Sequence, residues 1–203
     1  MDQYLTQYSD LHFERAGLFE VILKTFKCRD VLYLGCSIHI PPSLFFPHVV
    51  YVDQSEGSRR FFANQESILR YIKRHKKYKR SAYVRFIGQD YLQPLPLMDG
   101  KFDLLLALFA GGISRSCKQY LKPGGLLVTN NHQNDATEAS RDEELRLISK
   151  ISFRSGQHVI AEGGMDASKI PVQKSYKNAL RQSSGSVEYI EHEIYYVFER
   201  TSP

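Results

Sequence analysis

Two short apolar runs near the start of the chain limit what it can fold into. Residues 31–34 (VLYL) predict a buried strand that stops at Gly35, where glycine permits backbone dihedrals that other residues avoid. Residues 49–52 (VVYV) predict a second strand, which ends at Asp53. The interval has room only for a short helix, which we expect to begin near Pro41. This unit predicts a parallel sheet whose carboxyl edge binds a nucleoside, with the Asp53 carboxylate accepting hydrogen bonds from ribose hydroxyls.

The chain is long enough to bury a core. Its 203 residues are 42% hydrophobic and 12% aromatic, and we expect a single domain over residues 1–203. No run of about 18 apolar residues is present, and the polar start MDQYLTQYSD is unlike a secretory signal, so we expect a cytoplasmic protein without a membrane span. Cys28, Cys36 and Cys117 lack CxxC spacing, which favours buried, reduced thiols over a disulfide framework or a zinc site.

Apolar periodicity predicts the remaining elements. Residues 1–28 form an N-terminal helical segment in which Asp10 caps a helix over 10–26, while Tyr4 and Tyr8 lie on a loop that either covers the sheet edge as a lid or frays. The pattern further predicts helices over 56–78, 113–121 and 136–153, and strands over 82–87, 102–109, 126–129, 157–162 and 188–200. The long connection 163–186 is expected to form a flap or an interface. The last strand, rich in aromatic and β-branched residues, could pair with a second copy of the chain in a homo-oligomer.

A basic stretch ends the helix predicted over 56–78. Residues 70–80, from Arg70 to Arg80, carry seven positive charges and no negative one, whereas the whole chain has a net charge of +5. Subtracting the seven charges leaves about −2 for the rest, so the basic character is local to this stretch. Two interpretations remain open. The patch contacts the phosphates of RNA or an acidic partner, or it is a solvated helix end whose cations favour the helix dipole.

Polar side chains also follow the later predicted strands. Asp90 and Tyr91 come just after the strand at 82–87, and a carboxylate beside an aromatic ring is suited to hold a purine. A KPGG turn leads into the strand at 126–129, and His132 lies just beyond its end. These residues are therefore expected at the carboxyl edge of the sheet.

Taken in order, these features resemble a class I S-adenosylmethionine-dependent methyltransferase. The resemblance rests on the glycine after the first strand, the aspartates ending the next two, the FDLLLAL strand and the KPGGLLVTN turn and strand. It implies a doubly wound, mostly parallel α/β Rossmann-like sheet of seven strands with a C-terminal antiparallel hairpin. It also implies S-adenosylmethionine as cofactor, with the ribose on Asp53, the methionine part beside Gly35, and the adenine between Asp90 and Tyr91. The full set of implied cofactor-binding residues is Gly35, Ser37, Asp53, Gln54, Asp90, Tyr91 and Leu108.

The chain departs from the family pattern in its glycine-rich loop. Tyr33 replaces the usual acidic residue of the first strand, and Ser37 and His39 stand where later glycines belong. Either a redirected loop accommodates His39, or its side chain fills the pocket of a protein that has lost the cofactor. After the strand at 102–109 the chain lacks the Asn or Asp followed by prolines that is typical of enzymes methylating exocyclic amines, which argues against that subclass.

His132 is the candidate general base, because it follows the strand at 126–129 and can reach the carboxyl edge. The alternative is an ordinary histidine in a polar loop. The remaining histidines show no ligand spacing, so no metal is expected, although Asn131, His132 and Asp135 keep that question open.

Three functions are consistent with these residues. The favoured one is methyl transfer to a small-molecule acceptor, which depends largely on holding the nucleophile and the methyl carbon in line. The alternatives are an RNA methyltransferase that uses the basic patch at 70–80, and a non-catalytic binding module that keeps the fold without the donor site.

Overall fold

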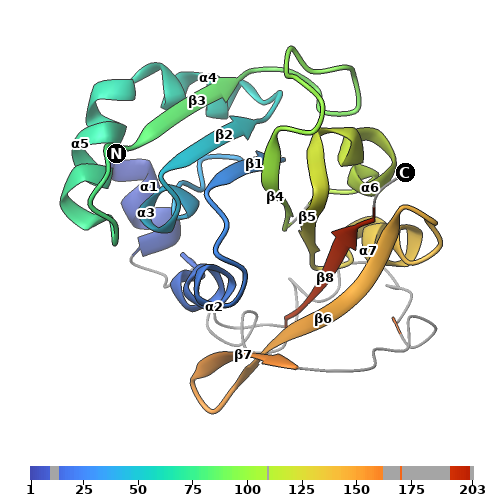
Figure 1. The fold of residues 1–203 in the computed structure, drawn as a ribbon. Helices are drawn as coiled ribbons and strands as arrows, with labels where there is room; N and C mark the ends of the chain where they lie inside the picture. Colours follow the sequence, from blue (N-terminus) through green and yellow to red (C-terminus); the bar gives the residue numbers. More distant parts are fainter. Residues whose placement is uncertain (10–13, 109, 162–169, 171–192, 202–203) are drawn as a thin grey trace.

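An eight-stranded sheet runs through the molecule in the order β3-β2-β1-β4-β5-β8-β6-β7 (Figure 1). The structure is a computed structural model that describes residues 1–9, 14–108, 110–161, 170 and 193–201. Strands β1 to β5 pair in parallel, and β8, β6 and β7 join them antiparallel. The strands are β1 (Asp30–Leu34), β2 (His48–Val52), β3 (Tyr83–Ile87), β4 (Phe102–Ala107), β5 (Leu121–Thr129), β6 (Leu145–Arg154), β7 (Gln157–Ala161) and β8 (Ile194–Arg200). The expected doubly wound, mostly parallel sheet is confirmed, and it has one strand more than the seven expected.

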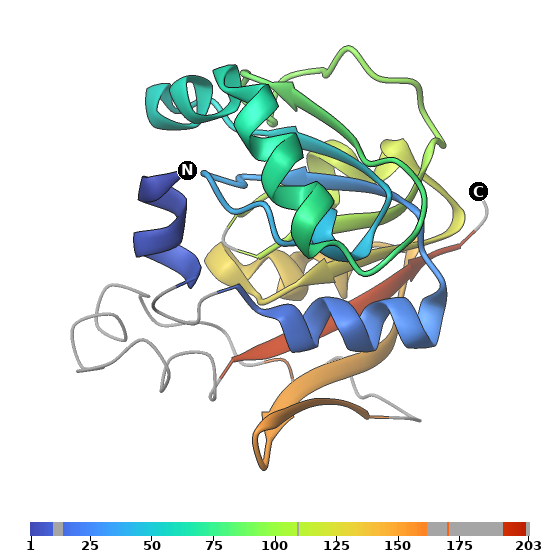
Figure 2. The ribbon, with the colours of Figure 1, turned by 90° about the vertical axis from the view of Figure 1, so that its left-hand side faces the viewer.

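Helices cover both faces of this sheet (Figure 2). They are α1 (Asp2–Tyr4), the π-helical turn η1 (Leu5–Ser9), α2 (Ala16–Phe26), α3 (Pro42–Phe45), α4 (Glu56–Ala63), α5 (Gln65–His75), α6 (Ile113–Cys117), the 3₁₀ turns η2 (Lys118–Tyr120) and η3 (His132–Asn134), and α7 (Asp135–Ala139). One core cluster joins apolar residues of α2, α4 and α5 to one face of the sheet, and a second joins those of α6 and α7 to the other. Because both faces are covered, the central strands are apolar on both sides.

The order of the strands creates a topological switch point at the centre of the sheet. Strand β1 has β2 on one side and β4 on the other, so the connections leaving the carboxyl ends of β1 and β4 run in opposite directions. In open parallel sheets a ligand binds outside the carboxyl ends at such a switch point. The short helix expected near Pro41 is present as α3, with Pro42 in its first turn.

Three expected helices differ from the structure. The helix over 136–153 is wrong: α7 ends at Ala139, and β6 begins at Leu145. In LRLISKISFR the apolar residues fit a helical period and also an alternation, and pairing with β8 and β7 favours the strand. The helix over 56–78 is interrupted at Asn64, whose side chain accepts from the Ser67 amide as the N-cap of α5. In the N-terminal segment, α2 begins at Ala16, and the expected cap Asp10 lies outside the described residues.

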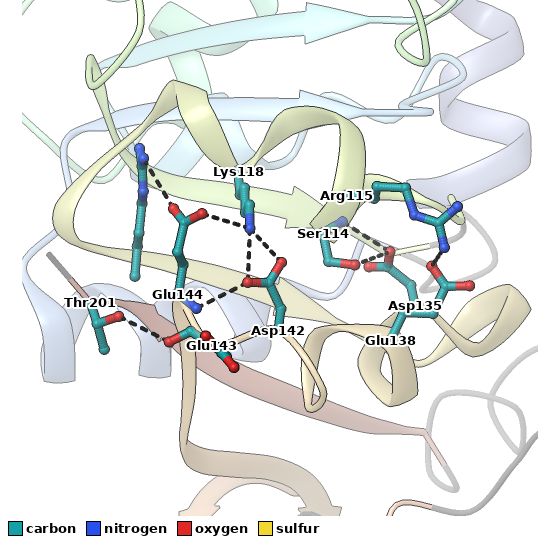
Figure 3. Close-up of polar contacts among 10 residues, drawn as sticks. Ser114, Arg115, Lys118, Asp135, Glu138, Asp142, Glu143, Glu144 and Thr201 are labelled. Atoms are coloured by element: carbon teal, nitrogen blue, oxygen red, sulfur yellow. Dashed lines mark hydrogen bonds and ion pairs between the residues drawn. The ribbon is translucent and has the colours of Figure 1, made fainter. Parts of the chain in front are cut away.

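Ion pairs and hydrogen bonds fix the connection between β5 and β6 (Figure 3). Lys118 binds both Asp142 (2.6 Å) and Glu144 (2.9 Å), and Arg200 of β8 also reaches Glu144. The buried Asp135 accepts from the amides of Ile113 (2.7 Å) and Ser114 (3.1 Å) at the start of α6. The Lys118 pairs lie near Leu121 at the start of β5, and the Asp135 bonds lie where α6 begins after β4.

The expected flap over 163–186 lies outside the described residues, except for Ile170, which is buried in the second core cluster. In the described part of the chain, no helix combines the length and the apolar character that crossing a bilayer demands.

Candidate functional site

The turn after β1 forms the centre of the candidate site. Gly35 has a φ of +62°, and its amide donates to the carbonyl of Val52 at the end of β2 (2.9 Å). A side chain at this position would meet Ala110 Cβ at 2.8 Å and the ring of Tyr91 at 3.5 Å. Only glycine therefore allows the turn after β1 to approach the loop after β4 this closely.

The Asp53 carboxylate ties this turn to the next helix. Its Oδ2 accepts from the Ser37 amide (2.9 Å) and its Oδ1 from the Ser55 amide (2.8 Å), just before α4. Partial burial alone would raise the pKa of Asp53, but hydrogen bonds from Ser55, Ser37 and Ser58 outweigh it and lower the pKa. A carboxylate oxygen accepts more than one hydrogen bond, so the ionised Asp53 keeps acceptor capacity for hydroxyl groups of a ligand.

The end of β3 contributes Asp90 and Tyr91. Asp90 Oδ1 accepts from the amide of Leu92 (3.0 Å) and so shapes the turn. Tyr91 is half-buried, lies against Gly35 and forms a hydrogen bond with the main chain of Gly111. Burial raises the pKa of Tyr91, and the bond to Gly111 opposes that rise. A carboxylate, an aromatic ring and the β1 turn thus meet at one edge of the sheet.

The N-terminal segment packs over this edge. Tyr8 in η1 forms a hydrogen bond with the side chain of Ser37, and its ring lies 4.9 Å from that of His39. Tyr4 is fully buried, with ring centroids 5.8 Å from Tyr8 and 5.4 Å from Tyr71. The segment is therefore packed rather than frayed, and it borders the turn after β1.

Tyr33 and His39, the two unusual residues of the loop, contact each other. The Tyr33 hydroxyl lies 3.1 Å from His39 Nδ1, and both side chains are buried in the core cluster beneath α2. Burial raises the pKa of Tyr33 well above its ordinary value, so the phenol stays neutral. Ser37 has a φ of +48°, a strained value for a residue with a Cβ, at a position where the family pattern has glycine. The ring of His39 packs against those of Tyr8, Phe19 and Tyr33.

The other predicted site residues are dispersed around this centre. Gln54 follows Asp53 and is exposed, whereas the side chain of Leu108 is fully buried in the core. His132 opens η3, where its amide donates to Asn130 Oδ1 (3.3 Å), and burial lowers its pKa. The structure thus joins Gly35, Ser37 and Asp53 directly, with Tyr91 in contact with Gly35.

Two contributors were not predicted as site residues. Ala110 packs on the β1 turn, and Gln133 packs on Gly111, where a Cβ would clash with it. The Gly-Gly pair after β4 signals a close approach of main chains, but nothing in the sequence marks Gln133. Asn131, Gln133 and Asn134 all have positive φ, which makes this loop a strained segment beside the site.

The described residues include no group of three or more His, Cys, Asp or Glu side chains arranged to hold a metal ion. Asp135, which the sequence left open as a ligand, instead caps α6.

Several known structures have a fold similar to that of this chain. A protein of Methanococcus maripaludis assigned as an S-adenosyl-L-methionine-dependent methyltransferase superposes with a TM-score of 0.52 at 12% identity, covering 100% of this chain and 91% of its own. Geranyl diphosphate methyltransferase in complex with S-adenosylmethionine gives 0.56 at 14% identity, with coverage of 95% and 88%. The Streptomyces coelicolor A3(2) geranyl diphosphate C-methyltransferase gives 0.54 at 13% identity, with coverage of 95% and 82%.

This chain has the class I methyltransferase fold. No protein-family model matches the sequence, and no curated protein is detectably similar to it. Within the methyltransferase fold, the residues of this chain fit S-adenosylmethionine at two points. Asp53 offers ionised acceptor oxygens where ribose hydroxyls would lie, and Gly35 supplies a turn that leaves no room for a side chain.

Proposed function

We propose that the protein binds S-adenosylmethionine at the carboxyl edge of β1 and β2 and transfers its methyl group to a small-molecule acceptor. The observation that carries the proposal is the Asp53 carboxylate, which is held below its ordinary pKa and joined to the Gly35 turn through Ser37. Asp53 and Gln54 bind the ribose, and Gly35 and Ser37 border the methionine part. The adenine lies among the three remaining residues, Asp90, Tyr91 and Leu108.

Bound S-adenosylmethionine would supply a sulfonium methyl group that is open to nucleophilic attack. The residues of the chain orient the reactants and exclude water, a contribution that needs few acid–base groups. The segment containing Tyr8 covers the turn after β1. His132 acts as the general base: burial lowers its pKa, so its ring is neutral at pH 7 and able to take a proton from the acceptor.

A small-molecule acceptor is supported by the structural neighbours that act on geranyl diphosphate. Two alternatives stay open for the same fold. An RNA methyltransferase would use the basic stretch at 70–80, and a non-catalytic module would keep the Asp53 turn without turnover.

Titration calorimetry with S-adenosylmethionine and S-adenosylhomocysteine tests the donor site. We expect micromolar binding of either ligand by the native protein, about −8 kcal/mol. Asp53→Asn removes the negative charge and keeps one of the two oxygens, so only one of the two amides, that of Ser37 or that of Ser55, keeps its acceptor. It should weaken binding at least tenfold, because the hydrogen bonds from ribose lose their charged acceptor.

Asp103→Asn is the matched control. Asp103 also accepts two main-chain amides, those of Arg29 (3.0 Å) and Asp30 (2.9 Å), but it lies near the start of β4, at the opposite edge of the sheet. This variant should bind both ligands like the native protein. A folded native protein that releases no heat with either ligand would leave the non-catalytic module as the remaining interpretation.

A further inference from the structure

A groove lies apart from the Asp53 turn, between the edge strand β3 and the junction of α4 and α5. It has a volume of about 590 Å³, and its lining includes Ala63 and Gln65, on either side of the break at Asn64 that separates the two helices. Figure 1 shows both helices alongside β3 at one end of the sheet. Because β3 is an edge strand, one row of its main-chain groups faces outward, and Gln65 Nε2 already donates to one of them, the carbonyl of Val84 (3.1 Å).

Two arginines whose positive charges have no acidic partner in the described part of the chain flank this groove. Arg59 and Arg85 are exposed, and the guanidinium group of neither has an ion-pair or hydrogen-bond partner among the described residues. None of the lining residues is acidic. The nearby cations Arg60 and Arg70, by contrast, pair with Glu56 and Glu66 along their own helices. The groove therefore carries two unpaired positive charges that attract an anion.

Three aromatic side chains, Phe62, Tyr83 and Phe86, form part of the lining. Phe62 and Phe86 stack at 4.5 Å with nearly parallel rings, and Phe86 keeps part of its surface accessible. Tyr83 is 49% exposed at the other end of β3, where a tilted contact with His48 (4.4 Å) steadies its ring. An exposed ring, here that of Tyr83, next to unpaired arginines is the combination on which the bases and phosphates of a single strand bind.

The basic stretch at 70–80 extends the positive surface beyond the groove. Lys76 is not available, since its Nζ donates to the main chain of Lys79 and Arg80 and lies over the Tyr78 ring. The exposed cations that continue the surface along the end of α5 and the following loop are Lys73, Arg74, Lys77, Lys79 and Arg80. Together with Arg59 and Arg85, these exposed cations outnumber the negative charges of one nucleotide, which favours a strand over a free nucleotide.

We propose that single-stranded RNA binds in this groove, with phosphates on Arg59 and Arg85 and a base stacked on Tyr83. The Gly88 end of the groove is two residues from Asp90, so a bound strand would run toward the edge that carries the candidate donor site. Donor binding and strand binding use different residues, so either can hold without the other.

Fluorescence anisotropy of a labelled, mixed-sequence RNA of about 12 nucleotides tests this proposal on the whole chain over a range of salt concentrations. The double variant Arg59→Gln, Arg85→Gln should weaken binding at least tenfold at low salt. The slope of log affinity against log salt should fall in magnitude by about 1.4, the value for two lost phosphate contacts. Tyr83→Leu should weaken binding about fivefold or more and leave the slope unchanged, because it removes stacking alone.

A second double variant, Arg141→Gln, Arg154→Gln, removes the same charge from exposed positions after α7 and at the end of β6. It should change the affinity less than twofold. An equal loss in both double variants would mean diffuse electrostatic attraction and would overturn the proposal.

Competing ligands test the identity of the occupant. If polyglutamate displaced the RNA, and if Tyr83→Leu left the affinity for RNA unchanged, the groove would be assigned to an acidic polypeptide instead. Adenosine monophosphate binding as tightly as the RNA would exclude a strand. S-adenosylhomocysteine titrations of the same variants should match the native protein, which separates this result from that of the donor site.

Discussion

Gly35 is constrained in two independent ways. Its φ of +62° disfavours every residue with a Cβ, and the space a Cβ would occupy is already taken by Ala110. Gly124, inside β5 where its register with β4 shifts, shares the first constraint, with a φ of +76°, but has no atom within 4 Å of the Cβ position. The two glycines therefore separate backbone strain from steric exclusion at the site.

Gly35→Ala should be clearly more harmful than Gly124→Ala. The positive φ costs each variant about 1–2 kcal/mol. The contact with Ala110 adds about 1–3 kcal/mol for overpacking in Gly35→Ala alone. Urea denaturation of both variants measures the difference in the free energy of unfolding, and calorimetry with S-adenosylhomocysteine should show weaker binding only for Gly35→Ala. Equal losses in the free energy of unfolding would mean that the loop after β4 moves aside easily and does not restrict the residue at the turn after β1.

Helix α6 depends on a carboxylate that is supplied from another element. Asp135, at the start of α7, is fully buried and accepts from the amides of Ile113 and Ser114 at the start of α6. Figure 3 shows its contacts with Ser114. Burial raises the pKa of Asp135 from 3.8 to about 6, although these amide hydrogen bonds oppose the rise. The folded protein thus binds this proton more tightly than the unfolded chain does. The stability from this group is fully present below about pH 4 and is lost as the pH rises through 6.

Asp135→Asn should remove this pH dependence, because the amide keeps the acceptor oxygen and does not titrate. Relative to the native protein, the variant should gain about 3 kcal/mol in its free energy of unfolding between pH 4 and pH 7. Urea denaturation across that range measures the difference. Asp103→Asn is a control of opposite sign: burial raises the pKa of Asp103, but Lys122 and two amides outweigh it and lower the pKa. Its cost should be greatest at pH 7 and fade on acidification. A flat difference curve for Asp135→Asn would contradict the argument.

The sequence was most informative where one short segment determines the structure. Strands β1 and β2, the turn at Gly35 and the aspartate after β2 were predictable, because each depends on a local apolar run and its end. Strand β6 was not, since its apolar residues satisfy two periods and only pairing with β8 chooses between them. The contact of Tyr91 with Gly111 depends on how two loops meet in space, and that of Tyr33 with His39 depends on how the loop after β1 folds back on the strand. The sequence showed both tyrosines without showing their partners.

A buried ion pair joins the two ends of the described chain. Arg15, just before α2, lies 3.1 Å from Glu193, just before β8, and both side chains are 4% exposed. Glu193 also accepts from Asn130 at the end of β5 (2.7 Å) and from Tyr195. Burial favours the neutral form of Arg15, but Glu193 outweighs this and raises the pKa of Arg15 further, so the guanidinium is charged. The pair therefore fixes the N-terminal segment, which covers the candidate site, against the far strands of the sheet.

Breaking this pair on one side should cost far more than breaking a surface pair. Glu193→Gln leaves a guanidinium buried without its counter-charge, and we expect a loss of about 3 kcal/mol in the free energy of unfolding. Arg146→Gln breaks the pair with Glu199, in which Arg146 is 68% exposed, and should cost less than about 1 kcal/mol. In the double variant Arg15→Met, Glu193→Gln no uncompensated charge remains, so its loss should be smaller than the sum of the two single losses. Urea denaturation of Arg15→Met, Glu193→Gln, their double variant and Arg146→Gln measures these losses in the free energy of unfolding. Additive losses for Arg15→Met and Glu193→Gln would mean that apolar packing, and not this ion pair, holds the two segments together.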